Sequence, residues 1–359
     1  MADTEDPHIR TVFVAGAGGF IGSRLTEILA RTPGIHVIAG YRRQPNRMHS
    51  QGVEIRVCDA TDVKAVSAAT RGVDYVVNCV AGNGRSMMAA TQALCDAARR
   101  MPPRRIVHLS SMAVYGDVTG TVSEQADLIA PCSAYGDAKR TCERIVTTYV
   151  RDGGDAVILR PGCVYGPGSR QWTAGLARLL RAGRAGDFGA AGDGVCNLVY
   201  VDDLVAAIQA AMSLPADAGR VGRARADAAR AFNVVCADPP TWNAYLTAFA
   251  RALGATPVRR LSARRLAVES RIVAPALRMA AIATRMAHLP AGWIPEAITP
   301  SLAGLLRQDI RLDGAAAAEA FRLTDTTLDE GLAASVRWFG PTPKRPLPQP
   351  EPALEAGQG

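Results

Sequence analysis

The sequence predicts an α/β protein built on a doubly wound parallel sheet of the Rossmann type, followed by a smaller, mainly helical part. Three observations support this prediction. Short apolar runs alternate with helical patterns, each run is apolar throughout, and the first run leads directly into a glycine-rich turn. Apolar strands separated by helices are typical of a parallel sheet that helices cover on both faces.

The predicted strands of this sheet are six apolar runs: Thr11–Ala15, His36–Ala39, Ile55–Cys58, Tyr75–Val80, Ile106–Leu109 and Ala156–Leu159. Helices are predicted between them, where apolar residues recur every three or four positions, starting near Ile21, over Met87–Arg100 and over about Tyr135–Tyr149. After about residue 168 helices dominate, with short strands near Leu198–Val201 and Phe232–Val235.

These patterns divide the 359 residues into four parts. We expect a disordered N-terminus at 1–10 and a Rossmann domain at 11–168, to which 198–208 and 232–236 return. A substrate-binding part covers 169–340, within which 215–230 is expected to be an exposed loop. At 341–359, proline stands at nearly alternate positions, which predicts a disordered, extended tail.

The composition excludes several classes of protein. The net charge is +8, but it comes from arginines spread along the chain, with only three lysines, so no nucleic-acid partner is predicted. The eight cysteines form no C-x-x-C pair and have no zinc spacing, which favours buried thiols in a reducing compartment and predicts no metal site. No signal peptide or transmembrane run is found, and a cytoplasmic location is expected.

The glycine-rich turn Gly16-Ala-Gly-Gly-Phe-Ile-Gly22 follows the first strand and opens a helix. Glycine at 16 allows the tight turn, Gly19 lets a pyrophosphate approach the backbone, and Gly22 lets the helix pack on the sheet. Phe20 and Ile21 lie within the same turn and belong to the predicted cofactor site. The alternative is a plain glycine-rich turn without a ligand, and the strand–turn–helix context disfavours this alternative.

The residues after the second strand favour NADP(H) over NAD(H), although NAD(H) remains an alternative. An NAD site places a carboxylate about 20 residues after the turn, whereas Arg42 stands there and can bind a 2′-phosphate. The alternative is a solvated surface arginine. Asp59, after the third strand, can accept from the adenine amino group or act as a loop or cap residue.

Tyr135 and Lys139 stand four residues apart, on one face of a predicted helix. A nearby ammonium lowers the pKa of a phenol, so Tyr135 can exchange a proton with a substrate alcohol or ketone, and Lys139 can bind the nicotinamide ribose. Ser111 follows the fifth strand at the carboxyl edge of the sheet, where it can polarise the reacting C–O group. The alternatives are a structural Tyr/Lys pair and a turn serine.

With these residues identified, the chain resembles an extended short-chain dehydrogenase/reductase of the NAD(P)-dependent epimerase/dehydratase family. The resemblance covers roughly 11 to 339 and rests on GAGGFIG, CDATD, GVDYVVNCVA, SSMAVYG, YGDAK, LRPGCVYGPG, VYVDDLVAAI and GLAASVRWF. It implies that Ser111, Tyr135 and Lys139 are the catalytic residues. It also implies cofactor contacts at Asp59, Ala60, Val80, Ala81 and Pro161. In addition, it implies a homodimer, as in many relatives.

Several positions depart from the pattern of members that act on nucleotide sugars. Cys163 and Cys196 stand where those members often carry a phosphate-binding Asn and Arg, and cysteine cannot replace them. Met112 and Ala113 replace the Asp-Glu pair of sugar dehydratases, so dehydration is not expected. The form RPGCVYGPG resembles the 3β-hydroxysteroid dehydrogenase-like and ketone-reductase branches.

Three functions follow from these observations. The first is an NADP(H)-dependent oxidoreductase that moves hydride between nicotinamide and a secondary alcohol or ketone of a small molecule. The second is a nucleotide-sugar epimerase with retained NAD(P), which would need phosphate anchors such as Arg170 or Arg178. The third is a non-catalytic protein that senses NADP, against which the intact catalytic residues count.

A segment of the C-terminal part carries arginines every seven residues, at 264, 271, 278 and 285, among apolar residues. This pattern is typical of a basic amphipathic helix, which can lie on a membrane surface or cover an apolar pocket. We favour the simpler interpretation, a surface helix with its arginines in water and no peripheral membrane contact. Pro275 is expected to break or start a helix there.

Overall fold

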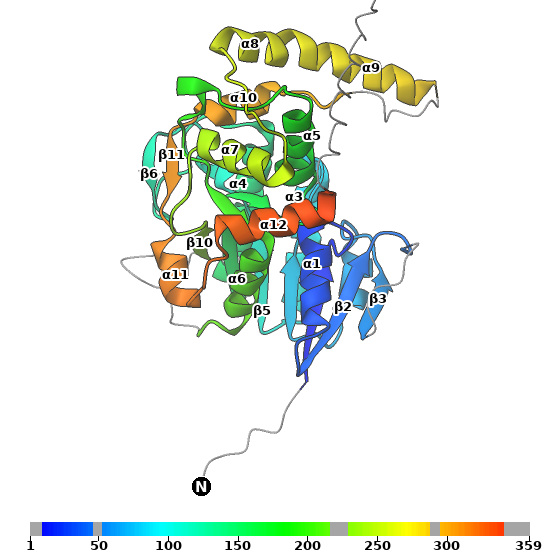
Figure 1. Cartoon of the computed structure of the whole chain (residues 1–359). Helices are drawn as coiled ribbons and strands as arrows, with labels where there is room; N and C mark the ends of the chain where they lie inside the picture. The colour runs from blue at the N-terminus through cyan, green and yellow to red at the C-terminus, as the bar shows by residue number, and fades with distance from the viewer. Residues whose placement is uncertain (1–8, 46–51, 216–228, 288–294, 341–359) are drawn as a thin grey trace, which may run out of the picture.

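The computed structural model describes residues 9–45, 52–215, 229–287 and 295–340 and centres on a seven-stranded parallel sheet (Figure 1). The strand order is β10-β7-β5-β4-β1-β2-β3. The predicted Rossmann-type fold is confirmed, and the order reverses between β1 and β4, where such sheets bind ligands. The strands are β1 (Arg10–Ala15), β2 (Ile35–Tyr41), β3 (Val53–Val57), β4 (Tyr75–Asn78), β5 (Arg105–Leu109), β7 (Ala156–Pro161) and β10 (Arg230–Val234).

Helices cover both faces of the sheet because alternate side chains of its strands are apolar on both sides. In β1, Val12 and Val14 pack toward one face and Phe13 and Ala15 toward the other, and all four are buried. The first face is covered by α1 (Phe20–Leu29) and α6 (Val201–Ser213). The opposite face is covered by α2 (Val63–Ala69), α3 (Gly84–Arg100) and α4 (Ala134–Arg151).

Pairing of two copies of the chain as a homodimer stays a prediction.

Two of these helices begin at side-chain caps that fix their first turns near the carboxyl edge of the sheet. Asn83 accepts a hydrogen bond from the backbone N–H of Ser86 at the start of α3 (2.9 Å). Ser133 accepts from the backbone N–H of Gly136 at the start of α4 (3.2 Å). Such caps accept hydrogen bonds from backbone N–H groups that have no partner within the first helical turn. Ser133 therefore sets where α4 begins. Tyr135 therefore lies in the first turn of α4.

Helices α5, α7, α8, α9 and α10 of the C-terminal part lie above the sheet in Figure 1, whereas α11 lies beside β10 and α6. Two small parallel sheets pair β6 with β11 and β8 with β9. The elements outside the large sheet and its helices are β6 (Gly120–Val122), β8 (Cys163–Tyr165), β9 (Leu198–Tyr200), β11 (Ile310–Leu312), α5 (Leu176–Arg181), α7 (Trp242–Leu253), α8 (Ala263–Val268), α9 (Ala274–Met286), α10 (Pro300–Arg307), α11 (Ala315–Phe321), α12 (Leu328–Phe339), the 3₁₀ turns η1 (Met112–Tyr115) and η3 (Gly189–Gly192), and the π-helical segments η2 (Arg170–Gly175) and η4 (Glu269–Val273).

The segments expected to return to the Rossmann domain take two different places. Strand β10 pairs with β7 at the edge of the large sheet, and α6 packs on α1. Strand β9, at 198–200, pairs with β8 in a separate small sheet instead. Gly162 explains this branch, because its missing side chain lets the chain after β7 lie directly against the carbonyl of Asn197. The predicted disordered N-terminus at 1–10 is too long by one residue, because β1 already begins at Arg10. Residues 1–8, the predicted tail at 341–359, and most of the predicted loop at 215–230 lie outside the described residues.

Candidate active site

The glycine-rich turn joins the end of β1 to the start of α1 at the point where the strand order reverses. Gly16 has a φ of +79°, and a Cβ there would lie 2.9 Å from the backbone carbonyl of Cys79. A Cβ on Gly22 would press against the carbonyl oxygen of Gly16. Both positions therefore require glycine, as the sequence predicts. A side chain at 16 would push the turn away from the segment that follows β4, and a side chain at 22 would push α1 away from the turn.

The N-terminus of α1 is open to the cleft beside this turn. Its N-cap, Gly19, offers no side-chain acceptor, and Gly19, Phe20 and Ile21 all line the cleft. The unpaired N–H groups of a first helical turn attract anions, with the helix dipole adding to the effect. These residues therefore fit the pyrophosphate of a dinucleotide.

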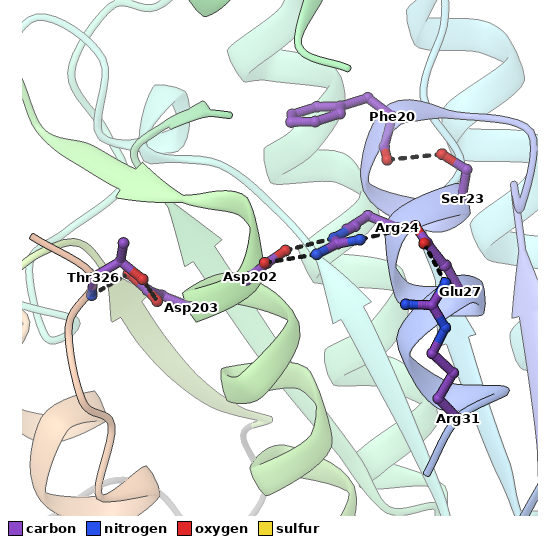
Figure 2. A network of polar contacts seen from close by, with 8 residues as sticks. All are labelled: Phe20, Ser23, Arg24, Glu27, Arg31, Asp202, Asp203 and Thr326. Atoms are coloured by element: carbon purple, nitrogen blue, oxygen red, sulfur yellow. Dashed lines mark hydrogen bonds and ion pairs between the residues drawn. The ribbon is translucent and has the colours of Figure 1, made fainter. Parts of the chain in front are cut away.

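Arg24 links α1 to α6 next to the same cleft, and the sequence analysis did not identify it (Figure 2). Its guanidinium donates to both carboxylate oxygens of Asp202, at 2.6 and 2.8 Å, and to Glu27 at 2.8 Å. The next residue, Asp203, accepts from the hydroxyl (2.6 Å) and backbone N–H (3.0 Å) of Thr326. The Asp-Asp pair of the VYVDDLVAAI motif thus holds α1 and the segment before α12 in place, which is a positioning role.

The three predicted catalytic residues come from two neighbouring elements. Ser111 follows β5 and caps η1, while Tyr135 and Lys139 lie on α4. The Tyr135 phenol is hydrogen-bonded to the Ser111 side chain. The Lys139 ammonium is buried, donates to the carbonyl of Leu109 at 2.7 Å, and lies 5.9 Å from the centre of the Tyr135 ring. All three line one cleft, so a substrate oxygen there can meet two hydroxyl groups at once.

The pKa of Tyr135 differs in direction from the one that the sequence predicts. Burial of the phenol raises the pKa of Tyr135 above its ordinary value, and the hydrogen bond from Ser111 opposes this rise. The sequence predicts a pKa lowered by Lys139 instead. The difference arises because the ammonium is held at the Leu109 carbonyl, below the ring, and burial also lowers the pKa of Lys139.

Because Tyr135 keeps its proton near neutral pH, we expect the two directions of the oxidoreduction that the sequence predicts to respond differently to pH. Alcohol oxidation requires the phenolate, so its rate should rise by about tenfold per pH unit below the pKa of Tyr135. Ketone reduction uses a proton that Tyr135 already holds, so its rate should change little from about pH 6 to about pH 8. Initial rates from the nicotinamide absorbance test this, and an oxidation rate that levels off below neutral pH would contradict it.

A buried polar network holds the elements that carry the predicted catalytic residues. Glu143, four residues after Lys139 on α4, accepts two hydrogen bonds from Arg160 of β7, at 3.0 and 2.7 Å. Ser110 donates to Glu143 at 2.5 Å, and Arg160 donates to the hydroxyl of Tyr115 at 2.9 Å. Tyr115 in turn donates to Asn233 of β10 at 2.6 Å. The network thus joins α4 to the end of β5, η1, β7 and β10, next to Ser111 and on the helix that carries Tyr135 and Lys139.

The cleft has a volume of about 960 Å³ and brings together most of the predicted site residues. It is lined by Gly19, Phe20, Ile21, Val80, Ala81, Ser111, Tyr135, Lys139 and Pro161. It is also lined by residues that the sequence analysis did not predict as cofactor contacts, among them Arg24, Gln171, Trp172 and Trp338. Trp338 belongs to the GLAASVRWF motif, which could have indicated it.

The residues predicted to contact adenosine lie at a different place, the ends of β2 and β3. Arg42, Asp59 and Ala60 are not among the described residues that line the cleft. Hydrogen bonds from the backbone and hydroxyl of Thr61, at 3.0 and 2.8 Å, lower the pKa of Asp59, and the charge of Arg42 adds to this. Asp59 therefore acts as the cap of its own loop, while the exposed Arg42 lies near it.

The two cysteines at the expected phosphate positions are buried rather than presented to a substrate. Cys163 in β8 is 3 % exposed, Cys196 is 0 % exposed, and burial raises the pKa of both thiols. Of the two alternative anchors, Arg170 lines the cleft, whereas Arg178 is paired with Glu296 at 2.7 Å. Among the residues that the structure describes, no group of acidic, His and Cys side chains could hold a metal ion, and no helix is long and apolar enough to cross a bilayer.

Comparison with known proteins identifies the family to which the chain belongs. Residues 12–224 match the NAD dependent epimerase/dehydratase family. The chain belongs to this family. It is 26 % identical to a UDP-glucose 4-epimerase of Vibrio cholerae over 230 residues, which are 59 % of this chain and 69 % of that protein. It is 29 % identical to a 3-diazoavenalumate denitrifying reductase of Streptomyces sp over 272 residues, which are 70 % and 84 % of the two chains.

The family fold extends over nearly the whole chain. A UDP-glucuronic acid 4-epimerase from Bacillus cereus, solved in complex with NAD, has a TM-score of 0.66 with this chain at 18 % identity. The similarity covers 92 % of this chain and 96 % of that one. At this identity the likeness shows a shared fold, and the chemistry must come from the residues of this chain.

Proposed function

We propose that the protein is an NADP(H)-dependent oxidoreductase that transfers hydride between nicotinamide and a secondary alcohol or ketone of a small molecule. The observation that supports this proposal is the single cleft that joins the glycine-rich turn to Ser111, Tyr135 and Lys139. A dinucleotide bound there would supply the hydride donor or acceptor. The chain itself supplies the anion-binding turn and the proton.

The role of each catalytic side chain follows from its surroundings. Ser111 binds the substrate oxygen and, through its hydrogen bond to the phenol, aligns it with Tyr135. Tyr135 gives its proton to the oxygen during reduction and takes it back during oxidation. Lys139, fixed at the Leu109 carbonyl, keeps a positive charge under the phenol and has two further N–H donors for a ribose hydroxyl.

The proposed preference for NADP(H) rests on the end of β2. Arg42 is exposed there, and the neighbouring carboxylate, Asp59, is already bound to Thr61. A guanidinium can bind a 2′-phosphate through paired, charge-assisted hydrogen bonds. Val80, Ala81 and Pro161, which line the cleft near the catalytic residues, would contact the nicotinamide half.

The proposed substrate is mainly apolar or lightly polar, because the usual diphosphate anchors are replaced by buried thiols. Cys163 and Cys196 offer a diphosphate neither charge nor accessible donors. Trp172 and Trp338 add apolar surface to the cleft. Dehydration is not proposed, since Met112 is buried beside the catalytic serine and contributes no acid or base.

A UDP-sugar 4-epimerase is the second candidate, and the relatives favour it. The relatives include UDP-glucose epimerases of Vibrio cholerae and Bacillus subtilis, and the solved structures with the same fold include a UDP-glucuronic acid 4-epimerase and a UDP-N-acetylglucosamine 4-epimerase of Bacillus cereus. Within the chain, Arg170 in the cleft could contact a diphosphate. An epimerase oxidises and then reduces the same carbon, so Ser111, Tyr135 and Lys139 would keep their roles.

One experiment separates the two candidates. The purified protein is incubated with NADPH or NADP⁺ and either a panel of ketones and secondary alcohols or UDP-glucose and UDP-glucuronate. The proposal predicts net consumption of cofactor in step with product, and the same rate in Arg170→Ala as in the control Arg178→Ala. Inversion at sugar C4 without net oxidation or reduction, weakened by Arg170→Ala alone, would establish the epimerase and overturn the proposal.

A further inference from the structure

One long helical segment of the C-terminal part is attached to the protein by only one of its faces. Helix α8, segment η4 and helix α9 follow one another without a break over residues 263–286, here called the outer helix, and Figure 1 shows α8 and α9 along the outer edge of the molecule. Its inner face is buried at Leu266, Glu269, Ser270 and Ala274. Glu269 is paired there with Arg184 of the protein body.

The opposite face of the outer helix is apolar and open. Its exposed residues Val268, Ile272, Met279, Ile282 and Met286 are 42 to 77 % accessible, and Pro275 is exposed between them. Together these six residues are spaced by 4, 3, 4, 3 and 4 positions, which places them on one stripe. Five of the eleven large apolar residues exposed in the described chain lie in this segment. Such a continuous stripe indicates a binding surface.

Positive charge borders the stripe. Arg264, Arg271 and Arg278 are exposed along one side at seven-residue intervals, and Arg265 is exposed as well. The sequence from 259 to 286 contains seven arginines and one acidic residue, Glu269, which is buried and paired. The outer face of this helix is therefore apolar and cationic, with no exposed carboxylate of its own.

This charge pattern disfavours a second copy of the chain as the occupant. The stripe has the 3–4 spacing of a helix pair, with Arg271 and Arg278 each directly before an apolar position. In an antiparallel pair these arginines would face arginines. In a parallel pair Arg271 and Arg278 would face positions such as Ala276 and Ala283, which carry no charge. The surface instead fits an anionic lipid bilayer. The bilayer offers negatively charged phosphates for the arginines and, below them, apolar acyl chains for the stripe.

We propose that the outer helix binds the protein to the surface of an anionic lipid bilayer. The stripe lies at the level of the acyl-chain boundary, and the arginines contact lipid phosphates. The helix lies along the surface and does not cross it. The sequence pattern favours a surface helix with its arginines in water, and the structure also exposes the apolar residues beside these arginines. This proposal is independent of the reaction proposed above.

The test is co-flotation of the full-length protein with lipid vesicles. We expect binding to vesicles of phosphatidylcholine with about one-third phosphatidylglycerol, at least about tenfold weaker binding to phosphatidylcholine alone, and weakening by salt. Ile272→Ser with Met279→Ser should reduce binding by about tenfold or more, and so should Arg271→Gln with Arg278→Gln. Ile129→Ser and Arg251→Gln, at exposed residues elsewhere, serve as matched controls and should bind as wild type.

Each other outcome overturns the proposal. Wild-type protein that does not float with anionic vesicles excludes a bilayer as the occupant. Binding that depends on the arginines but not on Ile272 and Met279 would be a charge effect without insertion of the stripe. A concentration-dependent dimer that Ile272→Ser with Met279→Ser abolishes, without vesicle binding, would assign the stripe to a second copy. Circular dichroism and thermal unfolding show whether each variant remains folded.

Discussion

Replacing Tyr135 by phenylalanine is expected to slow hydride transfer by about 10²- to 10⁴-fold, because the reacting oxygen loses its proton donor. The change removes only the phenol oxygen and leaves the glycine-rich turn and Lys139 in place. Cofactor affinity and thermal stability should therefore stay close to those of wild type. The measurement is kcat with the substrate that wild type converts fastest, together with a nicotinamide titration of the variant.

Tyr149→Phe is the matched control for this prediction. It makes the same chemical change on the same helix, α4, and the Tyr149 hydroxyl has no hydrogen-bond partner in the described part of the chain. Its kcat should equal that of wild type. If Tyr135→Phe also kept wild-type kcat, Tyr135 would not be the proton donor. A different outcome, in which the wild-type protein binds the cofactor but converts no substrate, would favour the NADP-sensing alternative.

Glu143→Gln is expected to destabilise the protein by about 3–5 kcal/mol, because it leaves the buried guanidinium of Arg160 without a compensating charge. Both side chains of the pair are 7 % exposed, so water cannot replace the lost carboxylate. The effect should appear in the free energy of unfolding from urea titration at neutral pH. The pair also joins α4 to β7, so kcat should fall as Tyr135 and Ser111 lose their alignment.

The control for Glu143→Gln is Asp238→Asn, which makes the same carboxylate-to-amide change in an exposed pair. Asp238 is 99 % exposed and lies 3.5 Å from Arg311. Exposed pairs contribute about 0–1 kcal/mol, so the unfolding free energy should hardly change. If Glu143→Gln cost as little as Asp238→Asn, the network under the catalytic residues would have no positioning role.

Much of the fold could be predicted because its strands and turns obey local rules. The apolar runs and the glycine-rich turn gave the Rossmann sheet, and the observed bounds of β1 and α4 differ from the predicted ones by one or two residues. The pairing of β9 with β8 could not be predicted, since it depends on Gly162 lying against a residue 35 positions away, Asn197. Contacts between distant segments leave no periodic pattern in a sequence.

In the candidate site, too, some residues could be predicted from the sequence and others could not. Glycines, Tyr135, Lys139 and Ser111 were found because their chemistry requires particular residue types at particular spacings. Arg24 and Glu143 were missed because their partners, Asp202 and Arg160, lie elsewhere in the chain. The direction of the Tyr135 pKa was also missed, because burial and the position of the Lys139 ammonium depend on the folded structure.

The central claim is that the cleft binds a nicotinamide dinucleotide with Arg42 at its adenosine end, and a binding titration tests it most directly. Protein freed of any co-purified nucleotide is titrated with NADPH and with NADH, following nicotinamide fluorescence, for wild type and Arg42→Ala. We expect saturation near one NADPH per chain, a preference over NADH of about tenfold or more, and loss of that preference in Arg42→Ala. Wild-type protein that binds neither dinucleotide would contradict the account.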